Sequence, residues 1–96
     1  MLVKPKWTFL TNHAHILFLI HKKQSITIRQ MAIQIGITER AVLRIIGELA
    51  NDNYLSVKKE GRRNTYTINL EKQLRHNLEH HCSIEKLLNA LSNNLI

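Results

Sequence analysis

Hydrophobic residues crowd the start of the chain more densely than any other part of it. Over residues 13–20 they cover nearly the whole circumference of a helix that Thr11 or Asn12 can cap and that runs to Lys22. A helix that is apolar all round is buried on more than one side. In so small a protein, we expect the second side to be covered by another subunit.

Two shorter helices are predicted next, each with a single apolar stripe. Thr27 and Gln30 have the spacing of a capping box, and Gly36 supplies the left-handed residue that ends the first of these helices. Thr38 caps the second, which is predicted over about 39–52. The stripes repeat at i, i+3, i+4 and i+7: Ile28, Met31, Ala32 and Ile35 in the first helix, and Val42, Ile45, Ile46 and Leu49 in the second.

From Tyr54 the hydrophobic period changes to two, which is typical of strands. We expect two strands within 55–69, joined by a turn over 60–63. From about Asn77 a last helix is predicted, because apolar residues again share one helical stripe. Its members are Leu78, Ile84, Leu87, Leu88, Leu91 and Leu95.

Two short helices, a glycine turn and a basic hairpin follow the order of elements in a winged helix-turn-helix. Counted from Ile28, a small residue stands fifth (Ala32), a glycine ninth (Gly36), and apolar residues fifteenth and eighteenth (Val42 and Ile45). Ala32 lets the two helices cross closely, and Gly36 accepts the positive φ of the turn. We therefore expect a mostly helical fold with a small β-hairpin, in which N- and C-terminal helices form a dimer interface.

Four segments of the chain resemble the small winged-helix transcriptional regulators of bacteria and archaea, the MarR-like and ArsR-like group. They are WTFLTNHAH (7–15), GITERAV (36–42), GRRNTY (61–66) and LRH (74–76), and together they span nearly the full length. The resemblance implies a homodimer that binds operator DNA through the helix after Gly36, with the hairpin as the wing. Leu43 departs from the polar residue expected in relatives, and Asn53 stands where a glycine often ends the recognition helix.

The charge distribution favours a nucleic-acid partner over an anionic membrane. The 96 residues include 14 Lys+Arg against 7 Asp+Glu, a net charge of +7. The whole surplus lies in residues 1–70, whereas residues 71–96 are neutral. Within one domain, we therefore assign 1–70 to DNA binding and 71–96 to dimerisation.

The predicted DNA contacts lie on the non-core face of the third helix and on the hairpin. Arg40 and Arg44, one turn apart, are predicted to contact guanine edges, and Leu43 a thymine methyl group. The alternative is a solvated helix face on which these arginines pair with Glu39 and Glu48. Hairpin cations are assigned to phosphates or the minor groove. The full set is Gln30, Thr38, Glu39, Arg40, Leu43, Arg44, Lys58, Lys59, Arg62, Arg63 and Asn64.

The predicted dimer residues are apolar side chains of the first and last helices. They are Ile16, Leu19, Ile20, Ile84, Leu87, Leu88, Leu91 and Leu95. The alternative is that the last helix lies back on its own domain, but two apolar helices flanking a neutral tail favour a subunit interface.

A group of histidines near the expected start of the last helix raises the question of a metal. His76 and His80 have the i, i+4 spacing that lets two side chains share one ion, and His81 and Cys82 follow directly. No carboxylate and second thiol together complete an evident site, and the spacing matches no zinc motif. We therefore predict structural polar contacts, with no metal and no cofactor.

Other features limit the remaining function classes. The single Cys82 cannot form an internal disulfide, no cleavable signal is evident, and the longest apolar run, 16–20, is too short to cross a bilayer. We expect a cytoplasmic, nucleoid-associated protein without membrane contact. No phosphate cradle or catalytic group is present, so an enzyme is not predicted. The alternatives are a metal-responsive ArsR-like regulator and a winged-helix protein-interaction module; the sequence identifies no small-molecule or metal effector.

Overall fold

The order of helices and strands agrees with the pattern of hydrophobic positions. The computed structural model describes residues 5–92, and in that range four helices and two strands follow one another. They are α1 (Asn12–Lys22), α2 (Ile28–Ile35), α3 (Glu39–Asn51), β1 (Leu55–Glu60), β2 (Arg63–Ile68) and α4 (Ile84–Ser92). The strands form one antiparallel hairpin in which Leu55 pairs with Ile68 and Glu60 with Arg63. The winged helix-turn-helix fold is confirmed.

Threonine caps begin the first three helices, as predicted. Each hydroxyl accepts a hydrogen bond from the backbone N–H three residues further on, which satisfies one of the free donors of the first turn. The pairs are Thr11 with Ala14 at 3.4 Å, Thr27 with Gln30 at 3.1 Å and Thr38 with Ala41 at 3.0 Å.

Left-handed residues end the two helices of the motif. Gly36 follows α2 with φ of 85°. Asn53 follows α3 with φ of 65°, at the position where the resemblance leads us to expect a glycine. Asparagine tolerates this conformation better than other residues that carry a side chain, so the exit from α3 is preserved without the glycine.

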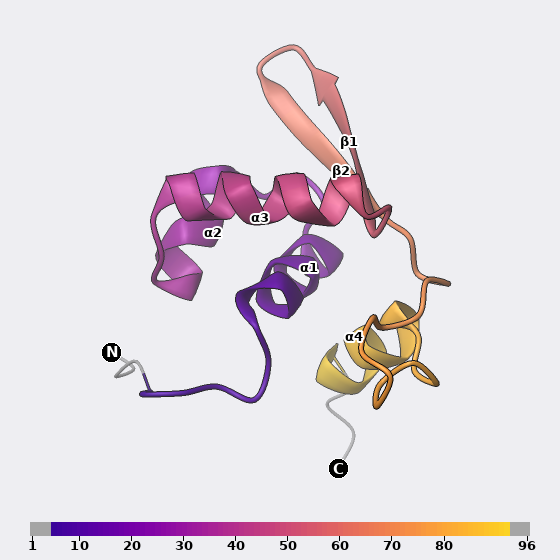
Figure 1. Cartoon of the computed structure of the whole chain (residues 1–96). Helices are drawn as coiled ribbons and strands as arrows, with labels where there is room; N and C mark the ends of the chain where they lie inside the picture. The colour runs from indigo at the N-terminus through magenta and orange to yellow at the C-terminus, as the bar shows by residue number, and fades with distance from the viewer. Residues whose placement is uncertain (1–4, 93–96) are drawn as a thin grey trace.

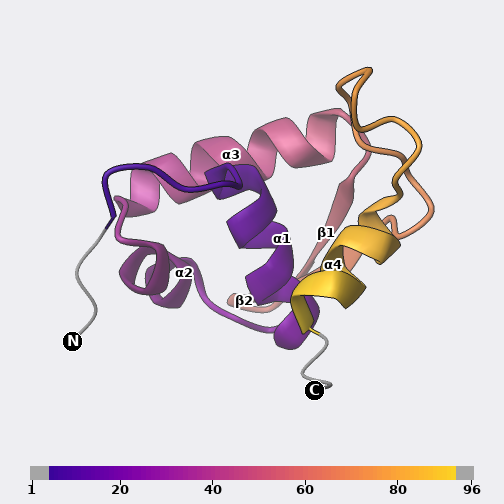
Figure 2. The same ribbon diagram turned by 90° about the horizontal axis from the view of Figure 1, so that it is seen from below.

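The apolar circumference of α1 is explained by its central position. This helix contacts α2, α3, β2 and α4 of its own chain. Figure 2 shows α1 between α2 on one side and α4 on the other, with α3 behind it. The expectation that a second subunit covers the other side of this helix is therefore corrected, because α4 and the hairpin cover it.

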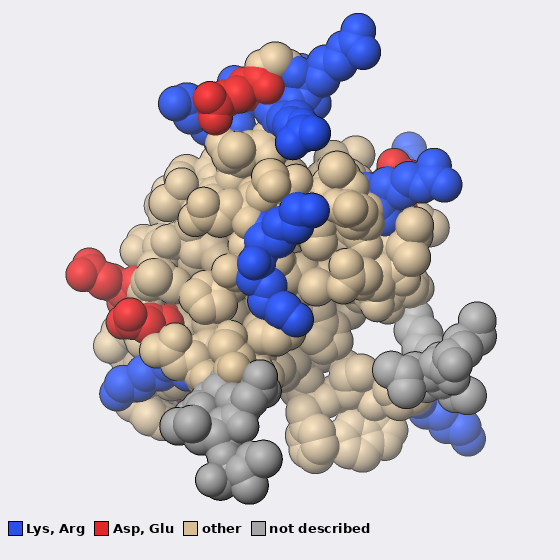
Figure 3. Space-filling model, turned by 180° about the vertical axis from the view of Figure 1, so that it is seen from behind, with Lys and Arg blue, Asp and Glu red and all other residues tan. Residues whose placement is uncertain are grey.

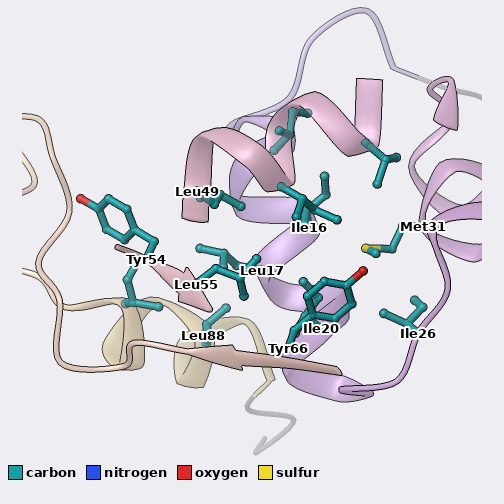
Figure 4. Close-up of a cluster of buried hydrophobic side chains, with 14 of the residues drawn as sticks. Ile16, Leu17, Ile20, Ile26, Met31, Leu49, Tyr54, Leu55, Tyr66 and Leu88 are labelled. Atoms are coloured by element: carbon teal, nitrogen blue, oxygen red, sulfur yellow. The ribbon is translucent and has the colours of Figure 1, made fainter. Parts of the chain in front are cut away.

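The core fills the space around α1. Side chains from every helix and both strands converge there, as Figure 4 shows. The most completely buried large side chains are Ile16, Ile20, Met31, Val42, Ile84 and Leu88. On β1, in contrast, Val57 is 42% exposed, because the outer part of the hairpin projects beyond the core.

Several predicted dimer residues are used by this core. Ile16, Ile20, Ile84 and Leu88 are at most 2% exposed within the single chain, so they have no surface left for a partner. Of the others, Leu19 and Leu87 are half-buried and Leu91 is 39% exposed. Leu95 lies outside the described residues.

The last helix begins later than predicted. Residues 69–83 form an irregular segment instead of the helical turns expected from Asn77, and Leu78 is 80% exposed. Ile84 N–H donates to the carbonyl oxygen of Lys72 at 2.8 Å, and Glu85 N–H to that of Leu70 at 3.0 Å. These bonds tie the start of α4 to the exit of the hairpin, and a helix continuing back through Asn77 would break them. Within residues 5–92 no helix is long and apolar enough to span a membrane.

Candidate nucleic-acid interface

Two predicted DNA-contacting residues, Gln30 and Thr38, take part in the caps at the starts of α2 and α3. Thr27 N–H donates to Gln30 Oε1 at 3.0 Å, which completes the capping box. The side-chain oxygen of Gln30 thus accepts a hydrogen bond within the protein, while its side-chain amide nitrogen is a donor suited to a phosphate. Thr38 Oγ1 likewise accepts from Ala41 N–H and keeps its own O–H as a donor. Both side chains are therefore held in place by their capping roles while each keeps a donor for an external acceptor.

The outward face of α3 carries the predicted base-reading residues. Its buried stripe is Val42, Ile45, Ile46 and Leu49, so the residues opposite that stripe point to solvent. Those exposed residues are Glu39, Arg40, Leu43, Arg44 and Gly47. Leu43 is 56% exposed, an uncovered apolar side chain between two arginines. This arrangement presents two guanidinium groups and one apolar group on a single helical surface.

The hairpin places its cations at the tip. Figure 1 shows it rising from the C-terminal end of α3, on the side of α3 away from α1. Gly61, with φ of 63°, forms the turn. In Figure 3, which views the molecule from behind, Lys and Arg side chains crowd this tip with acidic atoms beside them. Lys58, Lys59, Arg62 and Arg63 are exposed there, and Asn64, paired with Lys59 across the strands, is half-buried.

One carboxylate joins α1 to the outward face of α3. Glu48 Oε1 lies 2.8 Å from His13 Nε2, and Glu48 Oε2 lies 3.2 Å from an Arg44 guanidinium nitrogen. The hydrogen bond from His13 and the positive charge of Arg44 lower the pKa of Glu48 against the opposing effect of desolvation. Arg44 therefore adopts the paired state that the alternative interpretation predicted. Among the described residues Arg40 makes no ion pair, so its charge is free for an external partner.

Replacing Glu48 with glutamine should give a pH-dependent loss of stability. Because the pKa is lowered in the folded state, the ionised carboxylate stabilises the fold above the ordinary glutamate pKa, and this contribution is lost as pH falls through the lowered value. The unfolding free energies of wild type and Glu48→Gln should therefore differ at pH 7 and converge once the pH falls below the lowered pKa of Glu48. Urea unfolding at a series of pH values measures this, with Glu71→Gln as control for an exposed carboxylate. A difference that does not change with pH would contradict the assignment.

The histidine group has no helical geometry. His76, His80, His81 and Cys82 lie in the irregular segment before α4, so the i, i+4 spacing does not bring His76 and His80 onto one helical face. His76 Nδ1 instead accepts from Leu78 N–H at 3.1 Å. In residues 5–92 no three His, Cys, Asp or Glu side chains are grouped as metal ligands.

Sequence reasoning missed a cavity of about 320 Å³ between the start of α1, the end of α3 and α4. Apolar side chains such as Leu17, Leu49 and Leu87 line it, and the ion pair between Asp52 and Arg75, at 3.2 Å, contributes to its wall. The lining residues come from stretches scattered between residues 9 and 87, so no local pattern signals the cavity.

An exposed aromatic pair precedes α1 and was not predicted either. Trp7 and Phe9 are 69% and 93% exposed and stack edge to face with ring centroids 5.0 Å apart. Phe9 also borders the cavity, as Leu87 of α4 does. Large exposed aromatic side chains of this kind mark a surface suited to an apolar contact.

The similarities to known proteins agree with the winged helix-turn-helix fold of the chain. Residues 11–56, from the cap of α1 into β1, match a family described as winged helix-turn-helix DNA-binding. Comparison with curated protein sequences finds no match. Similar solved structures include the zinc-dependent MarR family transcriptional regulator AdcR in its Zn(II)-bound state, with a TM-score of 0.51 and 22% identity. The likeness covers 93% of this chain and 62% of that chain, so this chain spans less than two thirds of the length of that regulator.

Proposed function

Since this chain has the winged helix-turn-helix fold of the MarR-like regulators, we propose that it is a transcriptional regulator that binds specific sequences in double-stranded DNA. The observation that carries the proposal is the outward face of α3, where Arg40, Leu43 and Arg44 are exposed side by side. In this fold the second helix of the motif enters the major groove. A groove about 12 Å wide admits one helix, and arginine is the side chain best suited to the O6 and N7 acceptors of guanine.

Binding requires Arg44 to exchange one partner for another. In the free protein it pairs with Glu48, an i, i+4 contact between half-exposed side chains that contributes little energy. A bidentate contact between Arg44 and guanine contributes more free energy than this pair, because the contact is planar and desolvated. Within residues 5–92, Arg40 has no such ion-pair partner to leave. We therefore propose Arg40 and Arg44 as the base readers, with Gln30, Thr38 and the wing cations on phosphates.

The wing provides the direct test of DNA binding. Replacing Arg62 and Arg63 together with alanine should weaken binding to all duplexes alike, because phosphate contacts carry no sequence information. Each lost contact also removes about one released counterion, so the slope of log affinity against log salt should flatten by roughly two. Fluorescence anisotropy of a labelled duplex over a range of salt concentrations measures both effects.

The matched control removes two charges from the other part of the chain. Lys72→Ala combined with Lys86→Ala lowers the net charge equally but lies outside the wing and α3. We expect this variant to keep the wild-type slope. If the salt slope of the wing variant equals that of wild type, the wing does not contact DNA. If wild type binds no duplex, the proposed function is contradicted.

We also propose a homodimer, through a surface different from the one expected first. With the core residues excluded, the apolar side chains that keep exposed surface include Leu87 and Leu91 of α4 and the aromatic pair Trp7 and Phe9; Ile33, Leu43, Val57 and Leu78 are exposed as well. Phe9 and Leu87 border the same cavity, so these groups belong to one region. Two copies joined there would present two recognition helices to two half-sites. Sedimentation showing a monomer at micromolar concentration would overturn this proposal.

The two alternatives receive less support. A protein-interaction module does not explain why the net charge of +7 is concentrated in residues 1–70. Salt-dependent binding to duplex DNA would distinguish a regulator from such a module. Zinc dependence is a property of the AdcR regulator. In this chain, the described residues bring no three metal-ligating side chains together, so their geometry does not favour a metal-responsive regulator.

A further inference from the structure

Gly47 occupies an exposed position within α3 that helix geometry does not explain. Glycine weakens a helix interior, because it loses more backbone freedom on folding than any other residue. The backbone conformation at this position does not require glycine, since the glycines with positive φ are Gly36 and Gly61.

Packing within the chain does not require glycine here either. Apart from its chain neighbours and the adjoining backbone of α3, a Cβ atom added at Gly47 would meet no atom of the described residues within 4 Å. Ala32 is the opposite case: it is 6% exposed, on the helix that packs against α3. The space beside Gly47 is therefore open to the outside of the molecule, and a Cβ atom there would meet only an external partner.

The position of Gly47 indicates which partner that is. Arg40, Arg44 and Gly47 follow one another at i, i+4 and i+7, so they share one face of α3 within about 10 Å along the helix axis. This face is opposite the buried stripe. A helix with its side chains is about 10–12 Å in diameter, nearly the width of the major groove. A partner that receives both arginines must therefore pass very close to the helix at residue 47.

We propose that Gly47 is the point at which the backbone of α3 itself lies against a DNA strand at the edge of the groove. This inference rests on the proposed function and extends the contact surface beyond the first turns of α3. The missing Cβ lets the C-terminal half of the helix approach the sugar–phosphate strand. Any side chain at this position pushes the helix outward and lengthens the contact made by Arg44.

The experiment measures thermal stability and DNA affinity on the same variants. Gly47→Ala should raise Tm by about 4–8 °C, since alanine is the better helix former and finds open space. The same change should weaken binding to the selected operator by about tenfold. Gly47→Leu, with a larger side chain that also favours helices, should weaken binding further. A raised Tm together with a lowered affinity indicates a contact with DNA. If Gly47 had a structural role instead, its replacement would lower both Tm and affinity.

Asn89→Ala is the matched control, because it also places alanine at an exposed position within a helix, but in α4. It should raise Tm and leave affinity unchanged. If Gly47→Ala binds as tightly as wild type while Arg44→Ala loses affinity, the inference is overturned and the proposed function stands. A lowered Tm, or a changed sedimentation coefficient that indicates a second copy at this face, also overturns it. Failure of wild type to bind any duplex overturns both.

Discussion

Leu88→Asp should unfold the protein instead of dissociating a dimer into folded monomers. Leu88 has no exposed surface within its own chain and is among the most completely buried side chains of the core around α1. The substitution removes its packing, which costs about 2–5 kcal/mol, and adds a buried carboxylate without a partner. Because a domain of this size is stable by only about 5–15 kcal/mol, most of that stability is lost. Circular dichroism at 25 °C and thermal unfolding measure the result.

Leu91→Asp provides the control on the same helix. Its side chain is 39% exposed, so the charge reaches water and the fold should remain. If the proposed dimer surface is right, this variant sediments as a folded monomer. A Leu88→Asp protein with wild-type circular dichroism and a monomeric sedimentation coefficient would instead place Leu88 at a subunit interface and contradict the packing described above.

Arg40→Ala and Arg44→Ala should each remove specificity while leaving general DNA affinity largely intact. Loss of a bidentate guanine contact costs about 1–3 kcal/mol on the selected operator and far less on a scrambled duplex. The measurement is a paired titration of both duplexes at fixed salt, after selection of the operator from random DNA. Thermal unfolding first confirms that each variant folds.

Arg75→Ala serves as control for the loss of one guanidinium group. Its ion pair with Asp52 lies in the cavity wall at the far end of α3, so both duplexes should bind this variant as they bind wild type. If Arg40→Ala and Arg44→Ala lower the affinity for both duplexes by the same factor, these arginines are phosphate contacts. Sequence preference must then come from Glu39, Leu43 or the shape of the DNA.

The sequence by itself determined the local structure of the motif. The caps at Thr11, Thr27 and Thr38, the left-handed Gly36 and the hairpin turn were all predictable, because each depends on residues within three or four positions of one another. The outward face of α3 was predictable for the same reason, since its buried stripe fixes the opposite face. The candidate DNA-binding residues therefore lie where the pattern placed them.

Only the tertiary structure decided what covers each apolar surface. The pattern showed that α1 is buried on all sides, but not that α4 and the hairpin of the same chain bury it. The beginning of α4 was misplaced, because the N–H groups of Ile84 and Glu85 donate to the carbonyl oxygens of Lys72 and Leu70, and these hydrogen bonds override the apolar stripe. The cavity and the hydrogen bond between His13 and Glu48 join distant segments, whereas the pair of Arg44 with Glu48 is local, at i, i+4. Periodicity records whether a side chain is buried, whereas its partner depends on how segments far apart in sequence pack together.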